Sequence, residues 1–429
     1  MTIVLKNVSI LGGAAQDILI TGETIGAVGT NLAGQEVIDC SGLIALPGFV
    51  DLHTHLREPG FEQSETVLTG SQSAALGGFT AVHAMANTMP VADTAGVVEQ
   101  VATLGKEAGY VDVFPIGAVT VGLEGKQLAE LGAMATSRAA VRVFSDDGKC
   151  VHDPVIMRHA LEYVKAFDGV IAQHAQDPRM TEGAQMHEGA VSAELGLTGW
   201  PAVAEESIIA RDVLLAQHVD SRIHICHLST AGSVEIIRWA KAKGIKVTAE
   251  VTPHHLLLTD DLARSYNAVY KVNPPLRTQA DVLALREALI DGTIDIIATD
   301  HAPHPIESKD CEWSAAAFGM LGLETAASIA QDVLIASGKS SWQRLAEVLS
   351  IAPATIAADP NQGQPIAPGN VANITLIDPK VTRKVVAESA SKSINNPYVG
   401  LELPGKVVHT VYRGYLTVRD SVLAKEGRN

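Results

Sequence analysis

Two histidines separated by one residue, His53 and His55, end an apolar stretch of the chain. Side chains two positions apart on a β-strand project to the same side, so both imidazoles would point toward one place at the end of the strand. Two convergent imidazoles suit a bound metal ion. The alternative is a pair of half-buried histidines at a strand tip, and so short a motif leaves both interpretations open.

Other side chains that can bind metal follow later apolar stretches. The sequence contains 15 histidines, which chance would scatter through helices and loops. Instead, imidazoles and carboxylates recur where predicted strands end, at Asp146, Asp147, His174, His227 and Asp300. This recurrence favours a metal centre over isolated core histidines.

The elements that must bring these residues together are short β-branched stretches that alternate with amphipathic ones. The alternation predicts parallel β-α units, with helices such as 64–76, which Gly77 and Gly78 would end, and 202–219. Eight strands are expected, at 48–53, 79–84, 112–118, 140–145, 169–174, 222–227, 246–251 and 294–299. Eight such units predict a (β/α)8 barrel, whose active site lies at the carboxyl ends of the strands.

Alternation along the strands indicates which side chains face the barrel interior. If Ile296 and Ala298 point inward, Asp300 does so too. In the sixth strand the same rule turns Ile225 and His227 inward. The residues expected to face outward, as packing residues, are His224 and Cys226.

Three further histidines lie near the predicted site. His254 and His255 follow the seventh strand, but adjacent residues are poor joint ligands, so we expect structural or supporting roles. His83 lies inside the second strand, where a histidine with satisfied hydrogen bonds in the core is expected.

The number of candidate ligands points to two metal ions. Four imidazoles and two carboxylates are more than one catalytic zinc needs, which is three protein ligands and a water. Two divalent cations can share a carboxylate, and together they lower the pKa of a shared water enough to supply hydroxide near neutral pH. An imidazole-rich site without thiolates suits zinc, although the ligand types also admit manganese, cobalt or iron.

The composition excludes several classes of function. The chain has 429 residues, 47% of them hydrophobic and 4% aromatic, and a net charge of −16, which disfavours binding to nucleic acid or anionic membranes. No apolar run is long enough to span a bilayer, and the first residues alternate like a strand instead of forming a leader. The four cysteines (Cys40, Cys150, Cys226 and Cys311) lack paired spacing. We therefore expect a cytoplasmic enzyme.

Several longer segments resemble the amidohydrolase superfamily and, within it, the class I bacterial dihydroorotases. The resemblance runs over nearly the whole chain. It rests on residues 47–60, 87–90, 144–148, 187–189, 248–256, 273–277, 298–304 and 318–325. The resemblance implies a barrel over 47–364 and a small β-sandwich domain built from residues 1–46 and 365–429.

The resemblance also implies which residues act. One metal would be held by His53, His55 and Asp300, and the other by His174 and His227, with Asp147 as the bridge and Asp146 as the less favoured choice. The residues implied in substrate binding are Arg57, Asn87, Asn273, His304, Phe318 and Gly319.

Two of the substrate residues have alternative interpretations. Arg57 shares the inward parity of His55 and could hold the carboxylate of dihydroorotate, but it could also pair with Glu58 or Glu62. Asn273 precedes two prolines and could be a simple turn residue.

The implied reaction is the reversible opening of dihydroorotate to N-carbamoyl-L-aspartate in de novo pyrimidine (UMP) biosynthesis. A metal-bridging hydroxide would attack the ring amide, and Asp300 would carry its proton to the departing nitrogen. The alternative for Asp300 is a ligand without a role in proton transfer.

Three other interpretations stay open. Dihydropyrimidinases, hydantoinases and allantoinases open similar rings, but they bridge their metals with a carboxylated lysine after the fourth strand, where this chain has Asp146 and Asp147. A non-catalytic scaffold for aspartate transcarbamoylase is disfavoured because every expected ligand is present. Association with that enzyme as an active partner, and homo-oligomer formation, remain compatible with the sequence.

Overall fold

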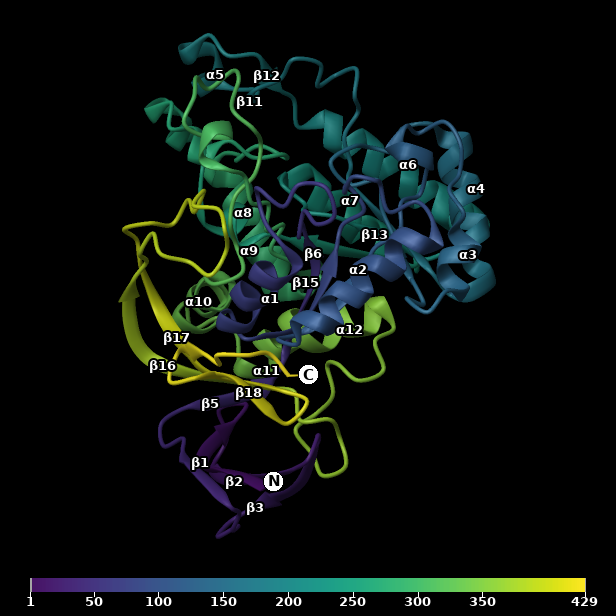
Figure 1. The fold of residues 1–429 in the computed structure, drawn as a ribbon. Helices are drawn as coiled ribbons and strands as arrows, with labels where there is room; N and C mark the ends of the chain where they lie inside the picture. The colour runs from purple at the N-terminus through teal and green to yellow at the C-terminus, as the bar shows by residue number, and fades with distance from the viewer. Residues whose placement is uncertain (1, 429) are drawn as a thin grey trace.

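The computed structural model describes residues 2–428 and contains the predicted barrel (Figure 1). Its strands are β6 (Phe49–Thr54), β7 (Phe79–Ala84), β8 (Asp112–Pro115), β9 (Val143–Phe144), β10 (Val170–Gln173), β13 (Ile223–Ile225), β14 (Val247–Val251) and β15 (Ile296–Ile297). Neighbouring strands pair in parallel, in the sets β6-β7-β8 and β9-β10-β13-β14-β15. Single parallel bridges, Gly117 with Phe144 and Thr54 with His301, join the two sets at both ends. The expectation of a (β/α)8 barrel is confirmed.

Helices surround the barrel. The longer ones are α1 (Val67–Leu76), α2 (Ala95–Ala108), α4 (Pro154–Val164), α6 (Val203–Val219), α7 (Ala231–Ala242) and α9 (Gln279–Asp291). The shorter ones are α3 (Leu131–Thr136), α5 (Ala190–Leu195), α8 (Pro253–Leu257), α10 (Ala326–Gln331), α11 (Trp342–Ala346) and α12 (Ala352–Ala357). Helix α1 begins later than predicted because Thr66 caps it, accepting a hydrogen bond from the Thr69 amide. Within residues 2–428 no helix is long and apolar enough to cross a membrane.

The barrel interior is filled by alternate residues of the strands. One buried cluster joins Leu52, Val143, Ala172, Ile296 and Ala298 with residues of α12. These contacts agree with the inward direction predicted for the last strand.

The alternation predicted for the sixth strand is wrong. Cys226 belongs to the interior cluster, and His224 lies inside as well, hydrogen-bonded to Glu250. Ile225 instead packs in the cluster that contains the outer helices. Because β13 ends at Ile225 and His227 has a φ of 33°, the chain is no longer extended at His227. The alternation of side chains along the strand therefore stops before His227. The turn in the backbone directs this imidazole to the site.

A second sheet is built from both ends of the chain. Its strands are β1 (Thr2–Ile10), β2 (Ala15–Thr21), β3 (Thr24–Gly29), β4 (Glu36–Asp39), β5 (Ile44–Pro47), β16 (Ile374–Lys384), β17 (Glu402–Tyr412), β18 (Tyr415–Arg419) and β19 (Val422–Leu423). Antiparallel pairing of β5 with β16 joins the N-terminal and C-terminal strands, which lie side by side in Figure 1. The expected β-sandwich from both chain ends is confirmed.

Two short strands form a separate small sheet. Strands β11 (Met186–His187) and β12 (Gly199–Trp200) pair in parallel within the segment between β10 and α6.

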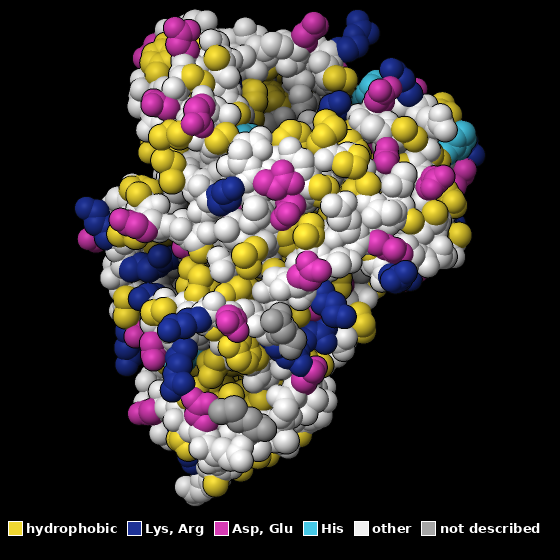
Figure 2. Space-filling model, viewed as in Figure 1, with side chains coloured by type: hydrophobic (Ala, Val, Ile, Leu, Met, Phe, Trp, Pro, Cys, Tyr) yellow, Lys and Arg dark blue, Asp and Glu magenta, His cyan; other side chains and the backbone are white. Residues whose placement is uncertain are grey.

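In Figure 2, lysine and arginine side chains gather in the lower half of this face, over the second sheet, although the chain as a whole is acidic.

Candidate metal centre

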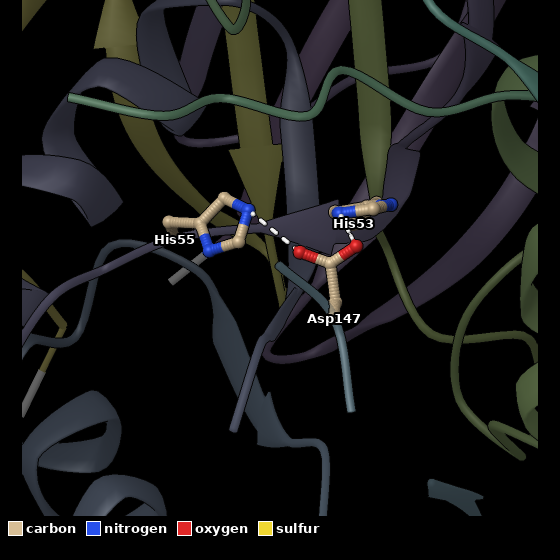
Figure 3. A group of neighbouring side chains, drawn as sticks. All are labelled: His53, His55 and Asp147. Carbon is tan, nitrogen blue, oxygen red and sulfur yellow. Dashed lines mark ion pairs between the residues drawn. The ribbon is translucent and has the colours of Figure 1, made fainter. Parts of the chain in front are cut away.

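The carboxyl end of β6 brings two imidazoles against two carboxylates, and Figure 3 shows His53 and His55 on either side of the first carboxylate, Asp147. His53 Nε2 lies 3.4 Å from Asp147 Oδ1 and 3.5 Å from Asp300 Oδ1. His55 Nε2 lies 3.3 Å from Asp147 Oδ2 and 3.0 Å from Asp300 Oδ1. All four side chains are buried. Both histidines therefore direct the same ring nitrogen toward the same pair of carboxylates.

A second pair of imidazoles faces Asp147 from the other side. His174 Nδ1 is 3.2 Å and His227 Nε2 is 3.4 Å from Asp147 Oδ1. These two ring nitrogens are only 2.8 Å from each other. Asp147 thus lies between the two histidine pairs and offers one oxygen or the other to each imidazole.

The arrangement fits bound divalent cations. His53 Nε2 and His227 Nδ1 are buried without a hydrogen-bond partner in the part of the chain that the structure describes. Burial opposes ionisation of Asp147, but the charge of His53 and hydrogen bonds from His174 and His227 outweigh it and hold its pKa well below the usual value. A buried anion among imidazole nitrogens is the donor set that zinc and related metals prefer.

Asp300 is ionised for the same reason. Burial again favours the neutral acid, and the positive charge of His53 with the hydrogen bond from His55 overcomes it and lowers the pKa of Asp300. Two ionised carboxylates can therefore neutralise positive charge at this centre.

Glu250, on β14, is a supporting residue that sequence reasoning missed. Its Oε1 lies 2.6 Å from His53 Nδ1 and accepts from the His227 amide at 3.1 Å. Its Oε2 lies 3.0 Å from His224 Nε2. Burial raises the pKa of this carboxyl, but the charges of His53 and His224 outweigh burial and lower the pKa far below normal. The sequence did contain a signal for this role, because a glutamate within a largely apolar barrel strand needs buried polar partners.

Other neighbours also orient the ligands. Asn87 Oδ1 lies 3.0 Å from His55 Nδ1, and Gln176 Oε1 lies 2.8 Å from His174 Nε2. Asp51 accepts hydrogen bonds from the His53 and Thr299 amides. Such partners select the tautomer of each imidazole and hold its ring in place. Sequence analysis identified Asn87 as a substrate residue and missed Gln176 and Asp51.

Asp146 points away from the centre. Its carboxylate accepts hydrogen bonds from the Val119 and Thr120 amides and from the Thr120 hydroxyl. Burial raises its pKa. Of the two adjacent aspartates, only Asp147 faces the histidines.

Arg57, which is expected to bind the substrate carboxylate, and His304 lie next to each other at the rim of the barrel, near the metal ligands. Arg57 donates to the Pro303 carbonyl at 3.1 Å, and its Nη2 lies 3.4 Å from His304 Nε2. Burial lowers the pKa of Arg57 to about 10, so the guanidinium stays charged at neutral pH. Within residues 2–428 the carboxylates of Glu58 and Glu62 accept from the Val67 and Gly60 amides instead of forming an ion pair with Arg57.

His304 connects this arginine to the backbone of the following loop. Its Nε2 donates to the Phe318 carbonyl at 2.7 Å. Burial, followed by the charge of Arg57, lowers the pKa of His304 to about 3, so the ring is neutral. Gly319 has a φ of 149°, and a Cβ there would lie 2.8 Å from the Ala302 carbonyl oxygen. Only glycine fits this close approach.

Of the remaining candidate residues, Asn273 lies near a proposed metal ligand, and three histidines are buried in the core. Asn273 Nδ2 donates to Gln176 Oε1 at 3.3 Å, near His174. His254 is buried with both ring nitrogens unpartnered within the described residues, and burial lowers its pKa to about 4. His255 lies 2.8 Å from Thr252 Oγ1, and His83 pairs with Asp359, away from the centre.

Comparisons with known proteins agree on the type of enzyme. A family model described as dihydro-orotase-like matches residues 42–233. A dihydroorotase of Streptomyces coelicolor is 67% identical over 98% of this chain and 99% of its own length. A dihydroorotase of Mycobacterium tuberculosis is 53% identical over 98% of this chain and 99% of its own.

Solved structures agree on the fold. The L-hydantoinase of Arthrobacter aurescens has a TM-score of 0.88 at 25% identity, covering 99% of this chain and 97% of that protein. A dihydropyrimidinase of Brevibacillus agri has a TM-score of 0.84 at 23% identity, covering 99% and 96%.

Proposed function

The chain belongs to the dihydroorotase family and is a cyclic amidohydrolase of pyrimidine biosynthesis, and we propose that it interconverts (S)-dihydroorotate and N-carbamoyl-L-aspartate at a centre of two divalent cations. The observation that carries the proposal is the position of Asp147 between two histidine pairs, with a charged guanidinium at the same rim. The first feature suits an amide-opening metal site, and the second suits a substrate carboxylate.

We further assign the chain to the class I type. A sheet made from both chain ends beside the barrel supports this assignment. So does Asp147, which follows β9, where hydantoinase-type relatives carry a carboxylated lysine.

In this proposal His53, His55 and Asp300 hold one cation, His174 and His227 hold the other, and Asp147 is shared. When bound, the cations supply a water that loses its proton near neutral pH and polarise the ring carbonyl. Zinc best suits these ligands.

Substrate would be oriented by the rim. The Arg57 guanidinium presents a flat pair of N–H donors to the carboxylate. Neutral His304 holds the Phe318 carbonyl and so positions the Phe318-Gly319 backbone beside the ring amide. Asn87 and Asn273 complete this binding set.

Asp300 would move the proton. Its lowered pKa keeps the carboxylate ionised, so it can accept the proton of the attacking hydroxide. It then delivers that proton to the amide nitrogen as the C–N bond breaks. In ring closure the same carboxyl begins protonated and the steps reverse.

Hydantoinase activity is the second candidate, because the likeness to L-hydantoinase covers 99% of the chain. The 67% identity to a dihydroorotase and the charged Arg57 favour dihydroorotate, since hydantoin carries no carboxylate.

The deciding experiment is turnover of L-dihydroorotate by zinc-loaded protein, measured beside hydantoin, dihydrouracil and allantoin, with a chelated control. We expect metal-dependent opening of dihydroorotate alone. Opening of only the uncharged rings would overturn the substrate, and inactivity with metal bound would favour a non-catalytic scaffold.

Three wider features belong to the same proposal. The domain boundaries are 1–46 with 365–429, and 47–364; a buried cluster made only of residues from the two chain ends, such as Leu5, Ile18 and Ile374, supports them. A cytoplasmic location is supported by the free state of all four cysteines within the described chain. The third feature is assembly, as a homo-oligomer and with aspartate transcarbamoylase, which size-exclusion chromatography of the protein alone and mixed with that enzyme would test.

A further inference from the structure

The connection between β16 and β17, residues 385–401, leaves the second sheet and follows the barrel rim. In Figure 1 it is the yellow loop that extends past α10 toward α8. Its backbone and side chains bond to the barrel at several points: Ser393 Oγ to the Ser64 carbonyl at 2.7 Å and the Lys392 amide to Glu65 at 3.0 Å. The segment is therefore fixed to the loop between β6 and α1.

Asn395, in this segment, bonds to both ends of one active-site loop. The amide nitrogen of its side chain donates to the Ala302 carbonyl at 2.9 Å and to the Gly319 carbonyl at 3.1 Å. Its side-chain oxygen accepts from the His304 amide at 3.2 Å. Its own carbonyl accepts from the Leu321 amide at 3.1 Å.

These bonds use the side chain fully. An asparagine amide has two N–H donors and one carbonyl acceptor, and each finds a partner here. The side chain is 3% exposed, so water cannot replace a lost bond at low cost. An aspartate of the same shape would direct an oxygen at two carbonyl oxygens, and an aliphatic residue would leave three buried polar groups unpaired.

The loop in question spans 302–321 and follows β15. It contains His304, Phe318 and Gly319, which the proposed function assigns to substrate binding. Its ends meet at Asn395, and one of them also carries the Pro303 carbonyl that accepts from Arg57. The two ends also bond to each other directly, through the Ala302 amide and the Met320 carbonyl at 2.8 Å, and Asn395 adds side-chain bonds to both ends from the C-terminal part of the chain.

We propose that Asn395 is a positioning residue of the substrate site: it joins the ends of loop 302–321 and thereby holds His304 and the Phe318-Gly319 backbone in place beside Arg57. The inference rests on the proposed function for the identity of the substrate. The expected change in amide exchange of the loop does not depend on that identity.

The test uses three variants of the full-length, metal-loaded protein. Asn395→Ala removes all three side-chain bonds, and Asn395→Asp keeps the acceptor for the His304 amide while it removes both donors. Asn396→Ala is the matched control, because among residues 2–428 Asn396 Oδ1 accepts only from the nearby Tyr398 amide. Each is measured for KM and kcat with dihydroorotate, for metal content, for melting temperature and for amide hydrogen exchange.

For both Asn395 variants we expect KM to rise about tenfold or more with metal content retained, because misplaced binding groups weaken the hold on substrate. Amide exchange within 302–321 should become faster, whereas the control keeps wild-type values. In Asn395→Asp the effect on exchange should be stronger at Gly319–Leu321 than at His304.

A merely structural role predicts a different result: a lower melting temperature with less active enzyme but an unchanged KM. That result, or wild-type exchange of the loop in Asn395→Ala, would overturn the inference. If both variants fail to fold, wild-type exchange still decides, since the His304 amide, which bonds to the Asn395 side chain, must then be more protected than the amides of 311–314. Faster loop exchange in an enzyme that does not turn over dihydroorotate would reject the proposed function alone.

Discussion

The two histidine pairs of the metal centre are held differently. On the β6 side, the Nδ1 atoms of His53 and His55 bond to Glu250 and Asn87. On the other side, His174 bonds to the neutral Gln176. His227 Nδ1 has no partner between residues 2 and 428. One pair is thus oriented by a carboxylate and an amide, and the other by a single amide.

This difference has a chemical consequence. A carboxylate on the far side of an imidazole fixes its tautomer and raises its basicity as a ligand. The β6 pair should therefore bind its cation more tightly. The second pair depends more on Asp147, which both cations would share. Four predictions test this comparison, from the largest expected effect to the smallest.

Asp147→Asn should have the largest effect. Losing the shared carboxylate should lower kcat about a thousandfold, several kcal/mol of transition-state stabilisation, and empty the His174–His227 half first. Turnover and metal content per subunit measure this. The matched control is Asp146→Asn, which should keep its metal because Asp146 bonds to the backbone of Val119 and Thr120. The reverse pattern would assign the bridge to Asp146.

Glu250→Gln should weaken metal binding by the β6 pair about 10- to 100-fold, the usual cost of losing such a partner. Gln176→Ala should weaken the other half less, because Gln176 is uncharged. Competition with a metal-binding dye gives both affinities. Equal losses in the two variants would show that the two halves are held alike.

Gradual chelation should release the two cations in separate steps. The half that lacks a carboxylate partner should lose its ion first, so a form with one metal per subunit should accumulate. Metal content and activity, followed against chelator concentration, would show two phases. A single phase would mean that the sites are equally strong or inseparable.

His187→Gln should give the smallest effect, at acid pH. Arg277 joins His187 to Ser229, two residues after His227, so this network supports the weaker half. Burial, and then the charge of Arg277, lowers the pKa of His187 to about 4 from 6.5. The unfolded chain therefore binds a proton first, and stability falls as pH drops from about 6.5 to 4.

The variant should lose less stability across that interval than wild type. Unfolding midpoints in urea at pH 7 and pH 5 measure it, and exposed His159→Gln serves as control. Identical losses in all three proteins would contradict this prediction.

Much of the barrel could be predicted because each of its strands is marked by a local run of apolar residues in the sequence. The strand predicted at 79–84 coincides with β7, and all eight predicted strands contain one of the observed strands or overlap it closely. The predicted strands around β9 and β15 are longer than the observed ones because apolar residues lie beyond the paired residues, Val141 before β9 and Ala298 after β15. Periodicity marks burial, whereas the ends of a strand depend on pairing partners.

The sequence by itself determined which residue types stand at the strand ends, and parallel β-α connectivity requires those ends to meet on one face. Only the tertiary structure decided that Asp147 and not Asp146 faces the histidines, that His227 enters through a backbone turn, and that Glu250 and Asn395 support the site. The physical reason is that these features depend on contacts between residues far apart in the chain, for which alternation along one strand carries no signal.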